Sequence, residues 1–179
     1  MNKYYLSQRA FIDSFINTKN GYKLRLMSDI SILNDILHSF DSDESARREI
    51  IEKIESNVCW HITRCETCEQ EVLSVYYKYQ LVDYNIGYIL LPISNINEVE
   101  IVHLHNDSPV KGLAEALIIS AIKNGGTRLS HFEGPLSEFY EKHCFEQFGY
   151  LKWDRCYAPD EWDDGLYGQP DIIMRRLKP

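Results

Sequence analysis

The chain has 179 residues, of which 44% are hydrophobic and 12% aromatic, a composition typical of a globular domain with a sizeable core. The net charge of −8 argues against a broad nucleic-acid surface, because such surfaces concentrate Lys and Arg. No apolar run approaches the roughly 18 residues of a membrane span, and the N-terminus MNKYYLSQRAFIDSF lacks the apolar region of a signal peptide. We therefore expect a single cytoplasmic domain, 1–179, that has no membrane partner.

The N-terminal part of the chain predicts helices around one short strand. Residues 4–16 carry apolar side chains near helical spacing and predict a helix within 1–20. Alternation over 22–27 predicts a strand that begins the domain core, about 22–177. A helix should run from residue 28 or 29 to about 40, and another should follow Asp43. The expected buried stripe of the first of these two helices is Ile30, Leu33, Ile36 and Leu37.

The rest of the chain alternates strands and helices. Segments dense in β-branched and aromatic residues predict the strands 58–64, 72–79, 85–91, 99–105, 127–132, 148–154 and 171–177. Pro92 is expected to end the third of these strands. Helices are expected over 112–124 and 135–143. The pattern predicts an α/β (α+β) fold with a mixed sheet of about seven strands flanked by helices.

The segment from Glu98 to Leu117, EVEIVHLHNDSPVKGLAEAL, predicts a strand, a loop and a helix start that carries the small residues Gly112 and Ala114. The alternation puts Val99, Ile101 and His103 on one strand face and Glu100, Val102 and Leu104 on the other. Free backbone N–H groups and the helix dipole at such a start favour an anion such as a pyrophosphate. The absence of large side chains lets a phosphate approach the backbone.

Two segments together resemble the GNAT (GCN5-related N-acetyltransferase) superfamily. The first is the Gly112-x-Ala114 step just described, and the second is GPLSEFYEKHCFEQFGY, residues 134–150, which looks like the family's "LYEKLGF" helix end. The resemblance covers roughly residues 22–177. The chain departs from the family pattern at Pro109, where Gln or Arg is usual, and at Gly134, Ser137 and Cys144, where Asn, Ala and Gly are common.

The resemblance implies a GNAT-like sheet and an acyl-coenzyme A, with acetyl-CoA as the co-substrate. It implies an acetyltransferase in which a neutral amine attacks the thioester directly, so that catalysis depends mainly on proximity and orientation. A backbone N–H of Leu104 or His105 would polarise the acyl carbonyl. The implied cofactor-binding residues are Leu104, His105, Val110, Lys111, Gly112, Leu113, Ala114 and Glu115.

The same resemblance implies the catalytic residues. Tyr140 matches the tyrosine that protonates or hydrogen-bonds the departing thiolate, and a phenol with a reference pKa of about 10 can act in that way. Glu98, and after it Glu100, are the expected general bases, with His103 and His105 as further candidates. The alternatives are a core tyrosine, strand-edge carboxylates in water, and packed histidines.

The connection between the last two predicted strands, DRCYAPDEWDDGLYGQPD (154–171), is strongly acidic. Its only basic residue is Arg155, and its acids are Asp154, Asp160, Glu161, Asp163, Asp164 and Asp171. Carboxylates beside aromatic faces attract ammonium groups, which favours a cationic amine acceptor such as a polyamine, an aminoglycoside-like amine or a lysine-rich peptide. The expected substrate-binding residues are Tyr157, Trp162, Asp163 and Asp164. A ligand-free acidic surface loop is the alternative.

Several further expectations concern partners. No metal is expected, because Cys65 and Cys68 form a single pair, which Cys59 and His61 could complete only if the strand bent around the ion. A homodimer is possible. Two other functions remain open: a catalytically inactive binding or regulatory module on this fold, and an acetyltransferase acting on aminoacyl-tRNA, which the net charge disfavours.

Overall fold

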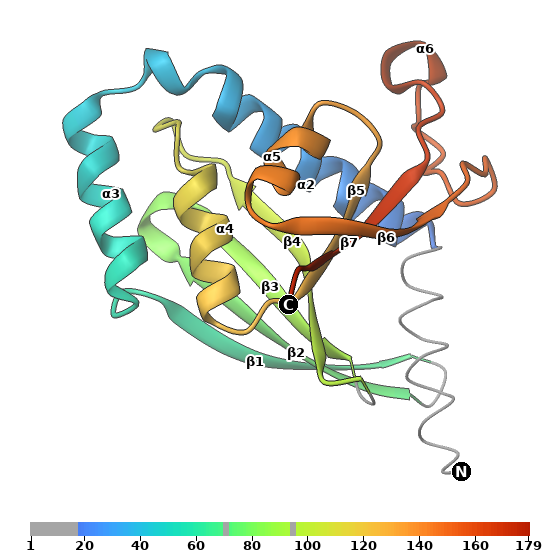
Figure 1. Ribbon diagram of the computed structural model, residues 1–179, viewed down its shortest axis with the longest axis horizontal. Helices are drawn as coiled ribbons and strands as arrows, with labels where there is room; N and C mark the ends of the chain where they lie inside the picture. The colour runs from blue at the N-terminus through green and yellow to red at the C-terminus, as the bar shows by residue number, and fades with distance from the viewer. Residues whose placement is uncertain (1–17, 70–71, 94–95) are drawn as a thin grey trace.

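The computed structural model describes residues 18–69, 72–93 and 96–179, which form a mixed seven-stranded sheet with helices (Figure 1). The strand order is β1-β2-β3-β4-β5-β7-β6; β4 and β5 are parallel, and the other neighbours are antiparallel. The predicted fold class is thereby confirmed. The strands are β1 His61–Glu69, β2 Val72–Leu81, β3 Ile86–Ile93, β4 Glu98–Asn106, β5 Arg128–Phe132, β6 Phe145–Leu151 and β7 Ile172–Leu177.

The helices are α2 Lys19–Leu37, α3 Glu44–Ser56, α4 Ala114–Lys123, α5 Leu136–Lys142 and α6 Asp164–Tyr167, with 3-10 turns at Ser39–Asp41 and Val82–Tyr84. The helices predicted after Asp43, over 112–124 and over 135–143 are present near those positions, whereas the helix predicted from residue 28 or 29 begins earlier and the short helix α6 was not predicted. The helix predicted over 4–16 lies outside the described residues. No helix in the described ranges is both long and apolar enough to cross a membrane.

The strand predicted over 22–27 is wrong, because these residues belong to α2. The helix begins at Lys19, and the Thr18 side chain caps it by accepting the Gly21 N–H at 3.2 Å. The buried residues of α2 recur at helical spacing, and the apparent alternation over 22–27 therefore reflects a helix buried on one side. They are Gly21, Tyr22, Arg25, Ser28, Ser31, Ile32 and Asp35.

The expected buried face of this helix is also wrong. Ile30 is 43% exposed and Leu37 is 63% exposed, while Leu33 and Ile36 are only partly buried. The face that is buried carries Arg25, Ser28, Ser31 and Asp35. A polar helix face can be buried when its partner surface presents unpaired backbone groups, because each such group needs a hydrogen bond.

Two details of the middle strands differ from the sequence prediction. Pro92 lies inside β3, not at its end. The pairing of β3 with β2 extends only as far as Leu90, so no hydrogen bond to β2 is lost because proline lacks an N–H group. In β4 the register shifts opposite Ile89 and Leu90, so the strict alternation of faces predicted for this strand does not hold. Ile101 and Leu104 are both buried as a result of this bulge.

The main core lies between the sheet and the helices α3 and α4. From α4 it takes Leu117, Ile118 and Ala121, which are fully buried, and from α3 it takes Ile50 and Ile54. Full burial of one aliphatic side chain contributes about 1.5–3 kcal/mol, so this layer fixes α4 against the sheet. A second cluster of buried hydrophobic side chains lies near the N-terminal end of α2. It consists of Tyr22, Phe132, Ala158, Trp162 and Ile172.

Candidate functional site

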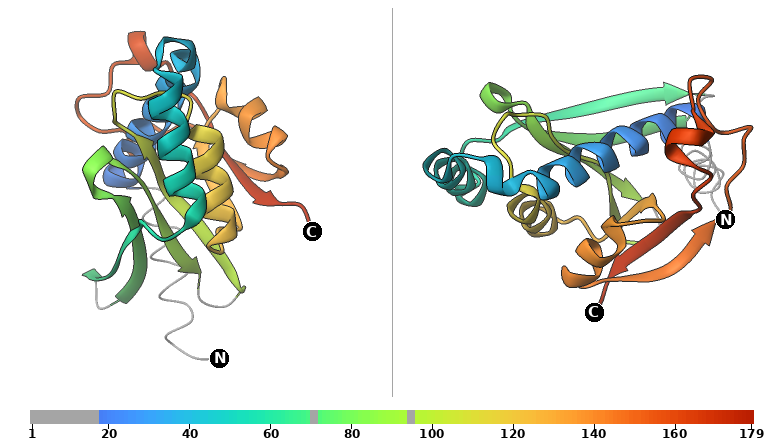
Figure 2. Two further views of the ribbon diagram at one scale, coloured as in Figure 1. Left: turned by 90° about the vertical axis from the view of Figure 1, so that its left-hand side faces the viewer. Right: turned by 90° about the horizontal axis from the view of Figure 1, so that it is seen from above.

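The candidate site is the opening between β4 and β5, beside the start of α4. The two strands pair at only two positions, Glu100 with Arg128 and Ile101 with Leu129. Beyond these pairs the backbone groups of both strand edges need other partners. Helix α2 lies along both strands at this place, between the β1–β3 and the β6–β7 sides of the curved sheet (Figure 2, right).

Serine side chains of α2 hydrogen-bond to the open edge of β4. The Ser28 hydroxyl accepts the Leu104 N–H at 3.1 Å and donates to the Leu104 carbonyl at 2.7 Å. Ser31 accepts the N–H of Asn106 at 2.8 Å. The Leu104 N–H, which the sequence assigned to an acyl carbonyl, therefore already has an intramolecular acceptor.

Asp35 hydrogen-bonds to the N-terminus of α4. Its Oδ2 accepts the N–H groups of Leu113 at 2.9 Å and Ala114 at 2.8 Å, and its Oδ1 accepts the side-chain amide of Asn106. Its backbone carbonyl accepts the N–H of Gly112 at 3.2 Å. Asp35 is fully buried, and a carboxylate at this place is stabilised by the same N–H groups and helix dipole that favour a phosphate.

The other residues of the predicted cofactor loop, 110–115, are also engaged. The Lys111 N–H donates to the Ser42 hydroxyl, and its ammonium group donates to the Ser108 carbonyl at 2.7 Å. The Val110 carbonyl accepts the Asn106 amide at 2.7 Å. Glu115 approaches Lys142 at 3.9 Å.

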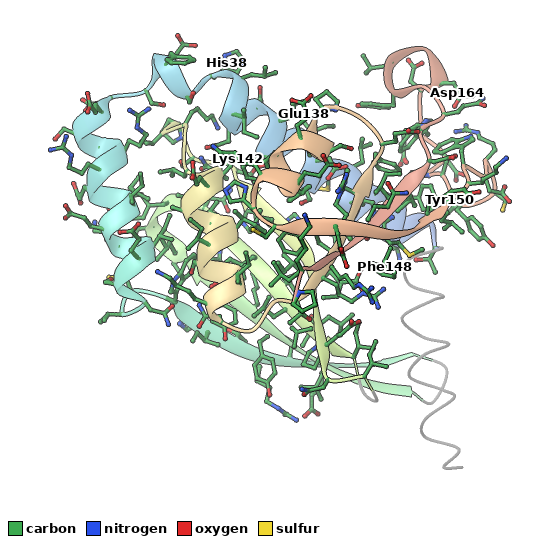
Figure 3. All side chains as sticks on the ribbon, in the orientation of Figure 1. His38, Glu138, Lys142, Phe148, Tyr150 and Asp164 are labelled. Carbon is green, nitrogen blue, oxygen red and sulfur yellow. The ribbon has the colours of Figure 1, made fainter. Side chains whose placement is uncertain are left out.

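Gly112 has a left-handed backbone conformation, which the sequence analysis did not predict. Its φ is +83°, a region that favours glycine, and a Cβ there would lie 3.0 Å from Cδ of Arg47. Arg47, on α3, therefore covers the loop from outside. Beside it lies a pocket of about 250 Å³, lined by Asp35, Ile36, Ser39, Arg47, Gly112, Ala114, Glu115, Phe139 and Lys142. Lys142 can be found on α5 in Figure 3.

The two candidate bases form ion pairs at the start of β4. Glu98 lies 3.2 Å from Arg128 Nη1, and Glu100, which is 1% exposed, lies 4.0 Å from Arg128 Nε. The Ser130 hydroxyl donates to Glu100 at 3.4 Å. These contacts give both carboxylates structural partners.

Tyr140 and the two histidines of β4 are packed side chains. Tyr140 is 3% exposed, its ring lies 5.0 Å from that of His131, and burial raises the pKa of its phenol. His103 and His105 stack with 4.5 Å between ring centroids. Burial lowers the pKa of His103 to about 4, and burial also lowers the pKa of His105. Both imidazole rings are therefore uncharged at neutral pH.

The predicted substrate-binding residues do not converge on the groove between β4 and β5. Tyr157 and Trp162 belong to the cluster around Tyr22. Asp163 caps α6 by accepting the N–H of Gly165 at 2.8 Å. Asp164, labelled in Figure 3 on the projecting helix α6, lies 3.9 Å from Arg155.

The polar face of α2 is the functional feature that the sequence prediction missed. The signal was a row of Ser28, Ser31 and Asp35, polar residues three or four positions apart. Such a row is ordinarily interpreted as a solvated helix face.

No group of three or more His, Cys, Asp or Glu side chains in the described ranges is arranged to hold a metal ion.

Comparisons with known proteins leave the family open. No protein-family model matches the chain, and no curated protein matches it. Among solved structures, N-acetylglutamate synthase from Neisseria gonorrhoeae complexed with coenzyme A and L-arginine is similar, with 16% identity and a TM-score of 0.35. The match covers 77% of this chain, which spans about a third, 32%, of that one.

Proposed function

We propose that this chain is a non-catalytic binding or regulatory module in which helix α2 fills the groove that an acyl-coenzyme A would need. The observation that carries the proposal is the position of Asp35. Its carboxylate accepts the N–H groups of Leu113 and Ala114, and a pyrophosphate could not bind the same two donors at the same time.

The edge of β4 supports the same proposal. A pantetheine arm or acyl carbonyl would need the Leu104 N–H, to which Ser28 is bonded, and the Asn106 N–H, to which Ser31 is bonded. Both serines face this edge because α2 is held along its whole length, from Tyr22 in the second core cluster to Asp35 at α4.

Displacing α2 would be energetically expensive. Hydrogen bonds between neutral groups contribute about 0.5–1.5 kcal/mol each and those to a charged group about 1.5–3 kcal/mol, so the contacts of Ser28, Ser31 and Asp35 together amount to on the order of 10 kcal/mol. A ligand with micromolar affinity supplies about 8 kcal/mol. Binding of the coenzyme at the expense of these contacts would therefore be weak.

Isothermal titration of the purified protein with acetyl-CoA, and with free coenzyme A in parallel, tests the proposal. We expect no binding up to about 1 mM ligand. Micromolar binding that is weakened at least tenfold by Lys142→Glu, a charge reversal on an exposed side chain beside Gly112, would overturn it. Lys152→Glu, on a lysine that does not line this pocket, is the matched control.

The second candidate is the acetyltransferase, which transfers an acetyl group from acetyl-CoA to an amine acceptor of cationic character. The pocket beside Gly112 favours it, because Arg47 and Lys142 bring two positive charges to the start of α4. This candidate requires α2 to leave the groove. The double variant Ser28→Ala/Asp35→Asn weakens the attachment of α2. Coenzyme binding that appears only in this variant would support the module, whereas equal binding by the wild-type chain and the variant would favour the acetyltransferase.

A further inference from the structure

A second pocket, of about 160 Å³, lies on the other side of α2, away from the predicted cofactor loop. It opens between α2, the end of β5, the start of α5 and the loop that precedes β7. Its lining is mostly apolar: Leu26, Asp29, Ile30, Leu33, Phe132, Glu133, Gly134, Pro135, Leu136, Trp162, Tyr167 and Pro170. None of these residues belongs to the loop 110–115.

Three aromatic rings stand in contact along this pocket. The Trp162 ring lies 5.3 Å from that of Phe132 at an interplanar angle of 63°, and 5.3 Å from that of Tyr167 at 56°. Inclined rings present both faces and edges to the pocket that they line. The negative face of an aromatic ring attracts a cation within about 6 Å, most strongly when the site excludes water.

The aromatic wall is held rigidly. The Trp162 indole N–H donates to the Gly168 carbonyl at 3.0 Å, and the Trp162 side chain also packs against Trp153 at 4.6 Å between centroids. Phe132 packs against Tyr22 at 5.7 Å. A preformed wall loses little conformational entropy when a ligand binds.

Asp29 supplies a negative charge to the same pocket. Its Oδ2 accepts the Phe132 N–H at 2.8 Å. Arg25 is near this carboxylate and lowers its pKa; its guanidinium donates to Ser130 and lies 5.9 Å from the centroid of the Phe132 ring. Burial raises the pKa of Asp29 to about 7, as expected for a carboxylate that lacks full compensation.

We propose that this pocket binds a small organic cation, an ammonium ion carrying methyl or alkyl groups, with Asp29 as its counter-charge and Phe132, Trp162 and Tyr167 as its walls. No Lys or Arg lines the pocket, and Glu133 adds a further negative charge at its rim, so an anion is disfavoured. The volume is below the roughly 300–1,000 Å³ of drug-sized sites, which limits the ligand to a head group such as trimethylammonium.

This inference goes beyond the proposed function and is independent of the coenzyme groove. Its test is a titration of the full chain with choline at pH 8, where Asp29 is largely ionised. The matched neutral probe is 3,3-dimethylbutan-1-ol, in which carbon replaces the quaternary nitrogen. We expect choline to bind with a dissociation constant near 1 mM or below, at least tenfold tighter than the alcohol.

Asp29→Asn should weaken choline binding at least tenfold. The amide oxygen can still accept the Phe132 N–H, so the fold should be retained. Asp160→Asn is the control; it removes an exposed carboxylate that pairs with Lys19 and does not line the pocket, so it should leave binding unchanged.

Ile30→Trp provides a variant that keeps Asp29. Ile30 is 43% exposed and lines the pocket, so a larger side chain there can fill the pocket without being forced into the core. We expect this variant to lose choline binding while its circular dichroism spectrum and thermal midpoint stay within the wild-type range. Equal affinities for choline and the alcohol, unchanged binding by Asp29→Asn, or no binding at about 10 mM choline would overturn the inference. Each of these outcomes leaves the acetyl-CoA titration unaffected.

Discussion

Helices α2 and α4 pack against the same sheet by opposite means. Helix α4 presents Leu117, Ile118 and Ala121 to the apolar core. Helix α2 presents Ser28 and Asp35 to backbone groups of β4 and of the start of α4. The difference follows from the partner surfaces: a sheet face buries side chains, while an open strand edge or a helix N-terminus requires hydrogen-bond acceptors.

The comparison is tested most strongly at Asp35. Asp35→Ala leaves two backbone N–H groups and the Asn106 amide without their buried acceptor, and each such group costs about 1–3 kcal/mol. We expect the free energy of unfolding to fall by about 4 kcal/mol, measured by urea denaturation. Asp41→Ala removes a carboxylate whose side chain is 79% exposed and should change it by less than about 0.5 kcal/mol. A loss equal to that of the control would mean that α2 is not held by this contact.

The corresponding change on α4 is Leu117→Ala. Leu117 is fully buried, so the substitution should lower the free energy of unfolding by about 3 kcal/mol through lost burial and the cavity left behind. Ile119→Ala, on the outer face where the side chain is 36% exposed, should cost much less. Similar losses for the two variants would contradict the assignment of an apolar inner face to α4.

The third prediction concerns pH, because two histidines with lowered pKa values, His103 and His131, lie on β4 and β5, the strands that α2 contacts. Burial lowers the pKa of His103 and of His131 to about 4, and the unfolded-state value is about 6.5. The unfolded chain then binds more protons, so this contribution to stability is present above pH 6.5 and is lost as the pH falls towards 4. His131 also accepts a hydrogen bond from Arg175 at 2.9 Å, which its protonation would break.

Asp29 acts in the opposite direction. Burial raises its pKa to about 7, so the native state holds a proton that the unfolded chain releases, and this contribution grows as the pH falls from 7 towards 4. The stability lost through the two histidines as the pH falls is larger than the stability gained through the one carboxylate. We expect wild-type stability to fall by about 1 kcal/mol per unit from pH 6.5 to 5, and by about twice that in Asp29→Asn. Urea denaturation across this range measures both slopes, and parallel slopes would contradict the raised pKa of Asp29.

The sequence by itself determined the elements whose signals are local. Asp43 was expected to precede a helix, and its carboxylate accepts the Ser45 and Ala46 N–H groups at the start of α3. The strands from β1 to β7 carry runs of β-branched and aromatic residues and lie within a few residues of their predicted bounds. Gly112 was expected near a helix start, and it lies two residues before α4 begins at Ala114.

Tertiary structure alone decided what the predicted cofactor loop is bonded to. The acceptors Ser28 and Asp35 lie 76 to 79 positions away from the backbone groups that they satisfy, so no local window of sequence could reveal the pairing. Side chains of one type that recur every three or four residues show that a helix has two different faces. The more hydrophobic face is ordinarily the buried one. That rule failed for α2, because its neighbours are open backbone groups whose demand for hydrogen bonds outweighs the burial of Ile30 and Leu37.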